Sequence, residues 1–184
     1  MHHIVPLVVF LFLLSQGFTT FDVYAHLLFS KHYRENWFSL IEHKVAGGLD
    51  VTTYPPLVHQ LIGFISFFIP LKSSYFLVLF VFWTMLSYFS AKFFSTYLNL
   101  SQDEHKLLYF LISLSSGVLI TIFVFGQITT IVGLAFTFAS LFFFLKFLKE
   151  GRLLHVILAF LSFSLVAFTH HFSLLLCVFS YVLL

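Results

Sequence analysis

Seven apolar runs occupy most of this chain, and one long polar passage at residues 19–59 interrupts them. Continuous apolar runs are typical of transmembrane α-helices, because a helix bonds its own backbone polar groups inside the membrane. The strands of a transmembrane β-barrel would instead alternate apolar and polar residues. We therefore predict an all-α, polytopic transmembrane helical bundle. The runs cover residues 4–21, 57–71, 74–97, 107–125, 128–145, 153–168 and 172–184.

The composition agrees with a membrane protein and excludes other classes. Of the 184 residues, 60% are hydrophobic and 9% are charged, with a mean hydropathy of +1.04, which excludes an ordinary soluble domain. The net charge of +2 and the lack of a basic cluster with interleaved aromatics argue against a nucleic-acid partner. The single cysteine, Cys177, leaves no disulfide framework and no cysteine-based metal site. We expect residues 1–184 to form a single transmembrane module.

The first and last apolar runs indicate which part of a protein this chain represents. Residues 4–21 have no Lys or Arg in front and no small-x-small motif behind, so we expect a retained first helix, with a cleaved leader as the alternative. Residues 172–184 would make a helix of about 20 Å without a polar flank. Since that is short for a membrane helix, we expect the N-terminal fragment of a longer protein.

The run at residues 57–71 is the one least suited to crossing a membrane. It contains about fifteen residues, roughly 22 Å of helix, and is interrupted by His59, Gln60 and Gly63 and ended by Pro70. We expect it to lie in the external interface or to dip into it. It would then belong to a long first external loop with interfacial helices, residues 22–73.

The positions of the basic residues support this assignment, because short cytosolic loops carry an excess of Lys and Arg. If residues 57–71 do not cross, the turns at 126–127 and 170–171 share the external side with the Asp22 loop. We predict a multi-pass cell-membrane protein in which labels at Gln127 and Lys149 react from opposite sides. The basic residues on the cytosolic side, which we interpret as topology determinants, are Lys92, Lys106, Lys146, Lys149 and Arg152.

Asp22 is the strongest candidate for chemistry, because it is an acid placed where a hydrophobic helix ends. A sheltered carboxylate there can accept a proton from an acceptor hydroxyl or hold a cation. The alternative is a structural one, since Asp is a good N-cap for a helix over residues 22–35. On that helix Asp22 and His26 are four residues apart and share a face.

Tyr54 and His59 lie at the other margin of the polar passage, where apolar character returns. They and His26 are candidates for substrate binding at a place where a lipid-borne and a water-borne substrate could meet. The alternative for both histidines is a satisfied interfacial residue on an amphipathic segment. Residues 54–56 also have a structural reading, as a rigid turn into the interfacial helix.

Gln127, with Thr129 and Thr130, offers hydrogen bonds to a sugar from a tight external turn. The alternative is that the turn only needs the backbone freedom of Gly126. External cations that could pair with a phosphate are Lys31, Arg34, Lys44 and Lys72.

His170 and His171 form a polar break between two apolar runs on the same predicted side. One of them could bond a phosphate or orient Asp22, or both could be plain interfacial residues in a turn. Adjacent histidines on a helix point about 100° apart, so they are poor joint ligands for one metal ion.

Four motifs, in their order and shared side, resemble the membrane glycosyltransferases of the GT-C superfamily. They are most similar to the prokaryotic, largely archaeal branch of the dolichyl-phosphate-mannose protein mannosyltransferase and oligosaccharyltransferase type. The resemblance covers nearly the whole chain, as the N-terminal part of a longer protein. The motifs are DVYAH at residues 22–26, YPPLVH at 54–59, the turn at 126–127, and THH at 169–171 after a basic turn.

The resemblance implies a hexosyltransferase that takes a sugar from a polyprenyl-phosphate or dolichyl-phosphate donor at the external membrane face. Asp22 would be the catalytic base toward the acceptor, and the interfacial helix after Tyr54 would border the lipid tail. A cation or histidine would stabilise the leaving phosphate. The part that selects the acceptor would come from later helices, a C-terminal domain or a partner subunit.

The chain departs from the oligosaccharyltransferase pattern at one place. In that branch the second external loop carries acidic metal ligands, whereas residues 126–127 here are Gly-Gln. A divalent metal therefore stays an open question, and no other cofactor is implied.

Two other classes of function remain open. One is a membrane transporter or metal-handling protein that uses the external histidines, although the long runs carry no acid or base where an ion path would need one. The other is a non-catalytic membrane scaffold or a degenerate fragment.

Overall fold

The fold is described from a computed structural model in which residues 7, 8, 10, 11, 15, 20–39, 41, 42, 48–50 and 54–184 are placed. Most of the predicted first helix at residues 4–21 lies outside the described residues. So does Lys44, one of the predicted external cations.

Three described segments are long and apolar enough to cross a membrane, which indicates an α-helical membrane protein. They are Leu71–Leu98, which is α4, Gln102–Phe125, and Ile128–Glu150, which is α7. The middle segment consists of α5 (Gln102–Ser113), α6 (Ser116–Ile120) and the π-helical turn η2 (Thr121–Phe125). Two shorter apolar helices, α8 (Leu153–Ala167) and α9 (His171–Leu183), complete the bundle.

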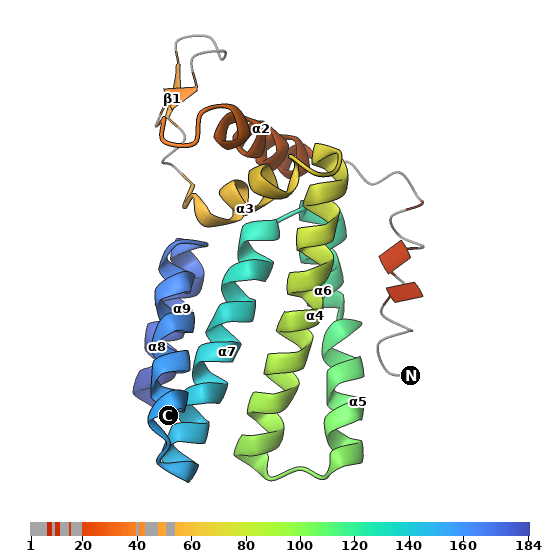
Figure 1. Cartoon of the computed structure of the whole chain (residues 1–184). Coiled ribbons are helices and arrows are strands. Elements are labelled where there is room, and N and C mark those ends of the chain that lie inside the picture. Colours follow the sequence, from red (N-terminus) through yellow and green to blue (C-terminus); the bar gives the residue numbers. More distant parts are fainter. Residues whose placement is uncertain are drawn as a thin grey trace.

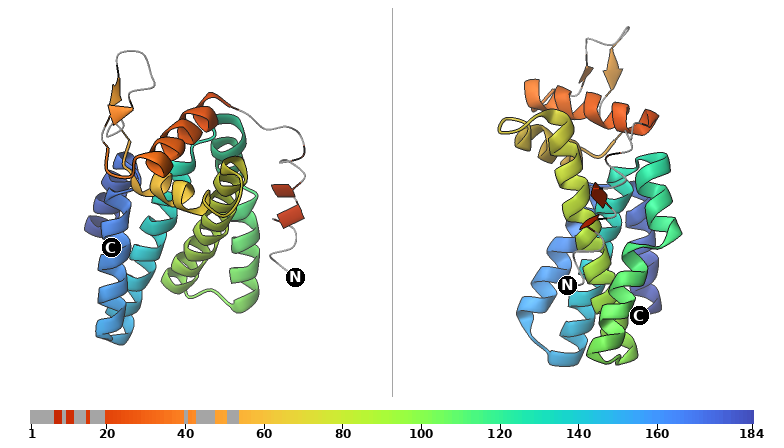
Figure 2. Two further views of the ribbon diagram at one scale, coloured as in Figure 1. Left: turned by 45° about the horizontal axis from the view of Figure 1, so that its top comes forward. Right: turned by 90° about the vertical axis from the view of Figure 1, so that its right-hand side faces the viewer.

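Helices α4 and α7 pack side by side at the centre of the bundle (Figures 1 and 2). The α5–η2 segment covers one flank of α4, where Nε1 of Trp83 donates to the carbonyl of Ser113 at 3.1 Å. Helices α8 and α9 cover α7 on the other flank. Large apolar side chains such as Leu153, Phe160 and Phe179 stay exposed on the outer surface, as expected where lipid replaces water.

The helix boundaries follow local capping signals that the apolar runs alone do not reveal. The run at 107–125 begins earlier, at Gln102, because Ser101 and Glu104 form a reciprocal capping box. That segment also breaks at Leu114 and ends in a π-helical turn before Gly126. π-Helical turns inside helices are frequent at functional sites.

A layer of short elements lies across one end of the bundle (Figure 1). It contains α2 (Phe21–Glu35), the two-residue antiparallel strands β1 (Ile41–Glu42) and β2 (Leu49–Asp50), and α3 (Leu57–Ile65). The strand pair is an addition to the all-α prediction. Helix α3 has nine residues, about 13 Å, which is too short to cross a membrane.

Gly63 lets α3 approach α2 closely. A Cβ atom at Gly63 would lie 2.9 Å from the carbonyl oxygen of Ser30, so the two backbones are nearly in contact. The buried faces of the two helices share His26, Ser30, Val58 and His59. Because α2 and α3 pack on each other, they form one platform above the bundle.

The two ends of the bundle differ in the residues that they carry. The α2–α3 end holds the platform and the turns at 126–127 and 169–170. The opposite end holds the turns at 99–101 and 151–152 and the basic residues Lys92, Lys106, Lys146, Lys149 and Arg152. The sequence grouped the residues in the same way, while the membrane side that each end faces stays a prediction.

Candidate functional site

The candidate site lies where the platform meets the bundle, and Asp22 is in the first turn of α2. The sequence offered Asp22 as an N-cap for this helix, but the structure places Asp22 in the first turn instead. The N-cap is Thr20, which has extended backbone angles and whose Oγ1 accepts a hydrogen bond from the Val23 amide at 3.4 Å. Because Thr20 satisfies the helix end, the carboxylate of Asp22 is not used for capping.

The Asp22 carboxylate is partly buried and makes no hydrogen bond or ion pair within the described part of the chain. The N-terminal end of α2 favours a negative charge at this position. The negative charge of Asp22 also interacts electrostatically with Tyr75, a buried residue in the first turns of α4. The structure therefore keeps one free carboxylate at the boundary between the apolar bundle and the polar platform.

His26, one helical turn beyond Asp22 on α2, forms a buried pair with His59 of α3. Nδ1 of His26 lies 2.9 Å from Nε2 of His59, so the two rings share one proton in a hydrogen bond. Their exposed fractions are 3% and 0%. The sequence placed both histidines on one side of the membrane, and the fold brings them into contact.

Burial keeps both histidines neutral at physiological pH. It lowers the pKa of His26 from 6.5 to about 4, with a smaller contribution from the nearby His170. Burial also lowers the pKa of His59 to about 3, with His26 adding to the effect. The backbone carbonyl of Pro55 partly offsets this by raising the pKa of His59, although Nδ1 of His59 has no hydrogen bond of normal geometry.

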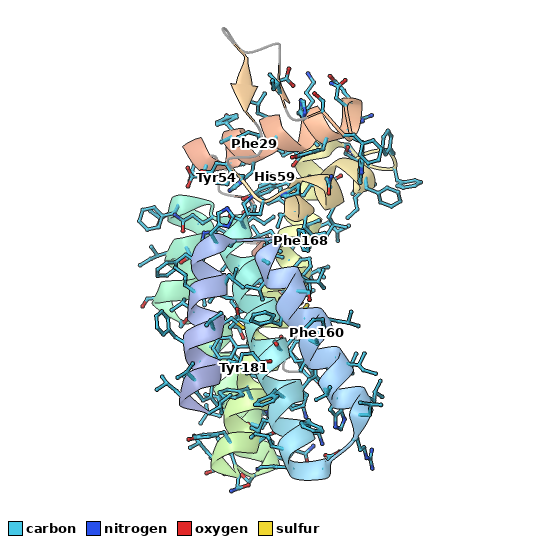
Figure 3. All side chains as sticks on the ribbon, turned by 90° about the vertical axis from the view of Figure 1, so that its left-hand side faces the viewer. Phe29, Tyr54, His59, Phe160, Phe168 and Tyr181 are labelled. Carbon is cyan, nitrogen blue, oxygen red and sulfur yellow. The ribbon has the colours of Figure 1, made fainter. Side chains whose placement is uncertain are left out.

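Aromatic rings surround the histidine pair. The ring centroid of Tyr54 lies 5.8 Å from that of His26 and 6.0 Å from that of His59, with both pairs edge-on. Phe29 lies 5.3 Å from His59 and 5.2 Å from Tyr54. Figure 3 shows the side chains of Phe29, Tyr54 and His59 grouped beneath α2, with Phe168 at the end of α8 just below. Tyr54 is 38% exposed, so it closes the cluster toward the surface.

The turn before α7 is locked to both the platform and α4. The Tyr75 hydroxyl donates to the carbonyl of Gly126 at 3.0 Å, and Thr20 Oγ1 donates to the carbonyl of Phe125 at 3.2 Å. Gly126 has a φ of +70°, and a Cβ there would collide with the Thr20 side chain and lie 2.9 Å from Val23. This turn therefore fixes the position of the N-terminus of α2 and of Asp22.

Gln127 follows in this turn and is exposed at the same end as Asp22. Thr130 Oγ1 donates to its side-chain oxygen at 3.4 Å, so the two form one polar group. Thr129, which the sequence also proposed for sugar binding, is 3% exposed and faces the core. Of the three predicted sugar ligands, only Gln127 and Thr130 are therefore within reach of a ligand.

His170 and His171 have different environments. His170 is the N-cap of α9, and its Nδ1 accepts from the Ser173 amide at 3.3 Å, while its Nε2 lies 3.4 Å from Thr130 Oγ1. Partial burial lowers its pKa, with His171 adding to the effect. His171 is exposed. His170 therefore belongs to the site and His171 to its rim.

Two features at this end were missed from sequence. Tyr75 was hidden inside an apolar run, although a hydroxyl so near the start of a membrane helix needs a polar partner. His32 was not singled out, yet it is 1% exposed and joins α2 to the strand pair, with Nδ1 2.9 Å from Glu42 Oε2 and Nε2 2.8 Å from the Ser39 carbonyl. Their long-range partners could not be read from spacing alone.

The predicted cations lie at the edges of this end. The Arg34 guanidinium stacks over the Phe67 ring at 5.5 Å, and Lys31 and Lys72 are exposed. Within the described residues, no group of three or more His, Cys, Asp or Glu side chains is placed to hold a metal ion.

Comparison with known proteins gave no relative for this chain. No family model, no curated protein and no solved structure matches it. The chemistry of the site must therefore be argued from its own residues.

Proposed function

We propose that the protein is a membrane glycosyltransferase, or part of one, in which Asp22 is the catalytic base. It would transfer a sugar from a polyprenyl-phosphate donor to an acceptor at the external membrane face. The observation that carries the proposal is the carboxylate of Asp22, which is partly buried and free of partners in the described part of the chain. A carboxylate without a structural role at the edge of an apolar bundle is well suited to general-base catalysis.

Asp22 is the only base that the proposed transfer step needs. Asp22 accepts the proton of an acceptor hydroxyl while the hydroxyl oxygen bonds to the anomeric carbon of the sugar. The bond between that carbon and the phosphate oxygen breaks, and the polyprenyl phosphate leaves with the electron pair. The exposed ammonium of Lys72, in the first turn of α4, is available at the same end to stabilise the leaving charge.

The neutral histidine pair supports the proposal as a hydrogen-bonding group for a sugar. Nδ1 of His26 and Nε2 of His59 bond each other, which leaves Nε2 of His26 outside that bond. His26 Nε2 is therefore available to donate to or accept from a sugar hydroxyl, depending on which ring carries the shared proton. Tyr54, Gln127 and His170 would line the same substrate.

An apolar groove supports a lipid-linked donor rather than a soluble one. The groove has a volume of about 470 Å³ between α7, α8 and α9, and Phe160 and Tyr181 line it (Figure 3). It lies below Phe168, whose carbonyl accepts from the Leu57 amide of α3 at 3.2 Å. A prenyl tail in this groove would keep its phosphate near the platform.

The test is transfer of radiolabelled mannose or glucose from short polyprenyl-phosphate donors in membranes that contain the protein. We expect Asp22→Asn to lower the rate about 100-fold or more, because general-base catalysis contributes at least that factor. Asp103→Asn is the matched control, since Asp103 is an exposed acid at the opposite end. Equal rates for wild type and Asp22→Asn, or no transfer above membranes without the protein, would overturn the proposal.

The metal-handling and transport alternative has less support. Among the described residues no side-chain group suits a metal ion, and the two histidines of the buried pair are already bonded to each other. A non-catalytic scaffold would be favoured if Asp22 tolerated substitution in the transfer assay.

A further inference from the structure

A polar hollow lies at the end of the bundle opposite the candidate site. It has a volume of about 510 Å³ and is formed by the C-terminal turns of α4 and α7 and the first turns of α5. All of its lining residues except Leu100 have polar side chains, and none of them is acidic. The lining residues that matter here are Lys92, Asn99, Ser101, Gln102, His105 and Lys149.

Two lysines, Lys92 and Lys149, line this hollow. Lys149 Nζ donates to the carbonyl of Thr96 and, at 3.1 Å, to Oδ1 of Asn99, so its position is fixed while one donor stays open. Lys92 Nζ lies 5.7 Å from the ring centroid of Tyr88 and makes no hydrogen bond within the described structure. Four N–H donors therefore remain available on two charged groups.

No carboxylate in the described part of the chain neutralises Lys92 or Lys149. Asp103 and Glu150 are paired with other lysines, and Glu104 is held by the neutral Ser101 cap, so neither lysine of the hollow has an ion-pair partner among the described residues. The bonds of these acids are Asp103 to Lys106 at 2.7 Å, Glu104 to the Ser101 amide at 2.8 Å, and Glu150 to Lys146.

We propose that this hollow binds the phosphate group of an anionic membrane lipid. A phosphate accepts charge-assisted hydrogen bonds from lysine, and basic pockets between membrane helices are suited to phosphorylated headgroups. The hollow lies at the end of membrane-length helices, at the level where headgroups would be. Exposed Tyr97 and Leu98, 54% and 56% accessible, flank it and offer apolar surface to the rest of a lipid. The sequence had assigned Lys149 to membrane topology only.

The test measures how much lipid stays bound to the full chain in nanodiscs of phosphatidylcholine with added phosphatidylglycerol. Native mass spectrometry of the released protein reports retained phosphatidylglycerol. We expect Lys92→Gln with Lys149→Gln to lower retention at least tenfold. The matched control is Lys146→Gln with Arg152→Gln, which removes the same charge at the same end outside the hollow and should retain lipid within twofold of wild type.

Equal retention by both double variants would overturn the proposal, because charge alone would then explain binding. Since Lys149 also bonds the end of α4, Lys92→Gln alone serves as a second variant that removes no hydrogen bond. It should lower retention several-fold without changing thermal unfolding in neutral lipid, and unchanged retention would overturn the site.

A further arm separates a lipid from a free phosphate. Inorganic phosphate is added at millimolar concentration to wild type in the same nanodiscs. If phosphatidylglycerol is retained, the lipid is the ligand, as proposed. If phosphate displaces it and stabilises the protein in neutral lipid, the phosphate chemistry is right but the lipid assignment is wrong.

Discussion

At the scale of single residues, the candidate site depends on which polar groups are already satisfied. Thr20 caps α2, His26 and His59 bond each other, and Tyr75 bonds the turn at Gly126. Asp22 is left without such a partner in the described part of the chain. The sequence identified Asp22, His26 and His59 as candidates because they are polar residues at the margins of apolar runs. It could not show the 2.9 Å pairing, which joins residues 33 positions apart.

The buried histidine pair predicts a stability that depends on pH. The folded pKa values of about 4 and about 3 lie below the value of 6.5 for a free histidine. The unfolded chain therefore binds more protons, and the free energy of unfolding should fall as the pH drops from about 6.5 toward about 4. For one histidine the slope is about 1.4 kcal/mol per pH unit. Thermal unfolding in detergent at pH 7 and pH 5 would measure it.

Two variants separate this pair from the other histidines. His59→Gln removes one buried imidazole and should reduce the loss between pH 7 and pH 5. His171→Gln changes an exposed histidine and should leave the loss unchanged. The same pH dependence in wild type and His59→Gln would show that the pair is not the source.

At the scale of elements, a turn and a helix end hold the site together. The apolar runs predicted α4, α7, α8 and α9 well, because each is apolar over most of its length. They did not predict the break at Leu114 or the early start of α5, since both depend on local capping and backbone geometry. The contact between α2 and the turn at Gly126 joins segments far apart in the chain, so it could not be predicted from the sequence either.

Alanine substitutions of three glycines test that contact. Gly126→Ala combines a positive φ with a collision against Thr20 and Val23, so it should lower the free energy of unfolding by about 2–4 kcal/mol. Gly151→Ala has the positive φ of +67° but open space, and should cost only about 1–2 kcal/mol. Gly117→Ala has neither and should be neutral or stabilise the protein by about 0.5–1 kcal/mol.

Chemical unfolding in mixed micelles measures all three differences. An equal loss of unfolding free energy in Gly126→Ala and Gly151→Ala would mean that α2 does not pack closely against the turn. The position of Asp22 would then have to be fixed by other contacts.

At the scale of the whole molecule, the bundle separates two kinds of chemistry. The α2–α3 end gathers Asp22, the histidine pair, Gln127 and His170. The opposite end gathers five of the basic residues and the polar hollow; the five are Lys92, Lys106, Lys146, Lys149 and Arg152. The sequence predicted this grouping from the positions of lysine and arginine, because helix direction alternates along the chain. The volume and lining of the polar hollow and of the apolar groove could not be predicted, since they depend on how the helices pack.

Both the proposed transfer reaction and the proposed lipid site require the two ends of the bundle to face opposite sides of a membrane. Single cysteines at Gln127 and Arg152, both exposed, test this in intact cells with Cys177→Ala as the background. A membrane-impermeant thiol reagent should label Gln127→Cys from outside and Arg152→Cys only after permeabilisation. Labelling of both cysteines from the same side would contradict the account.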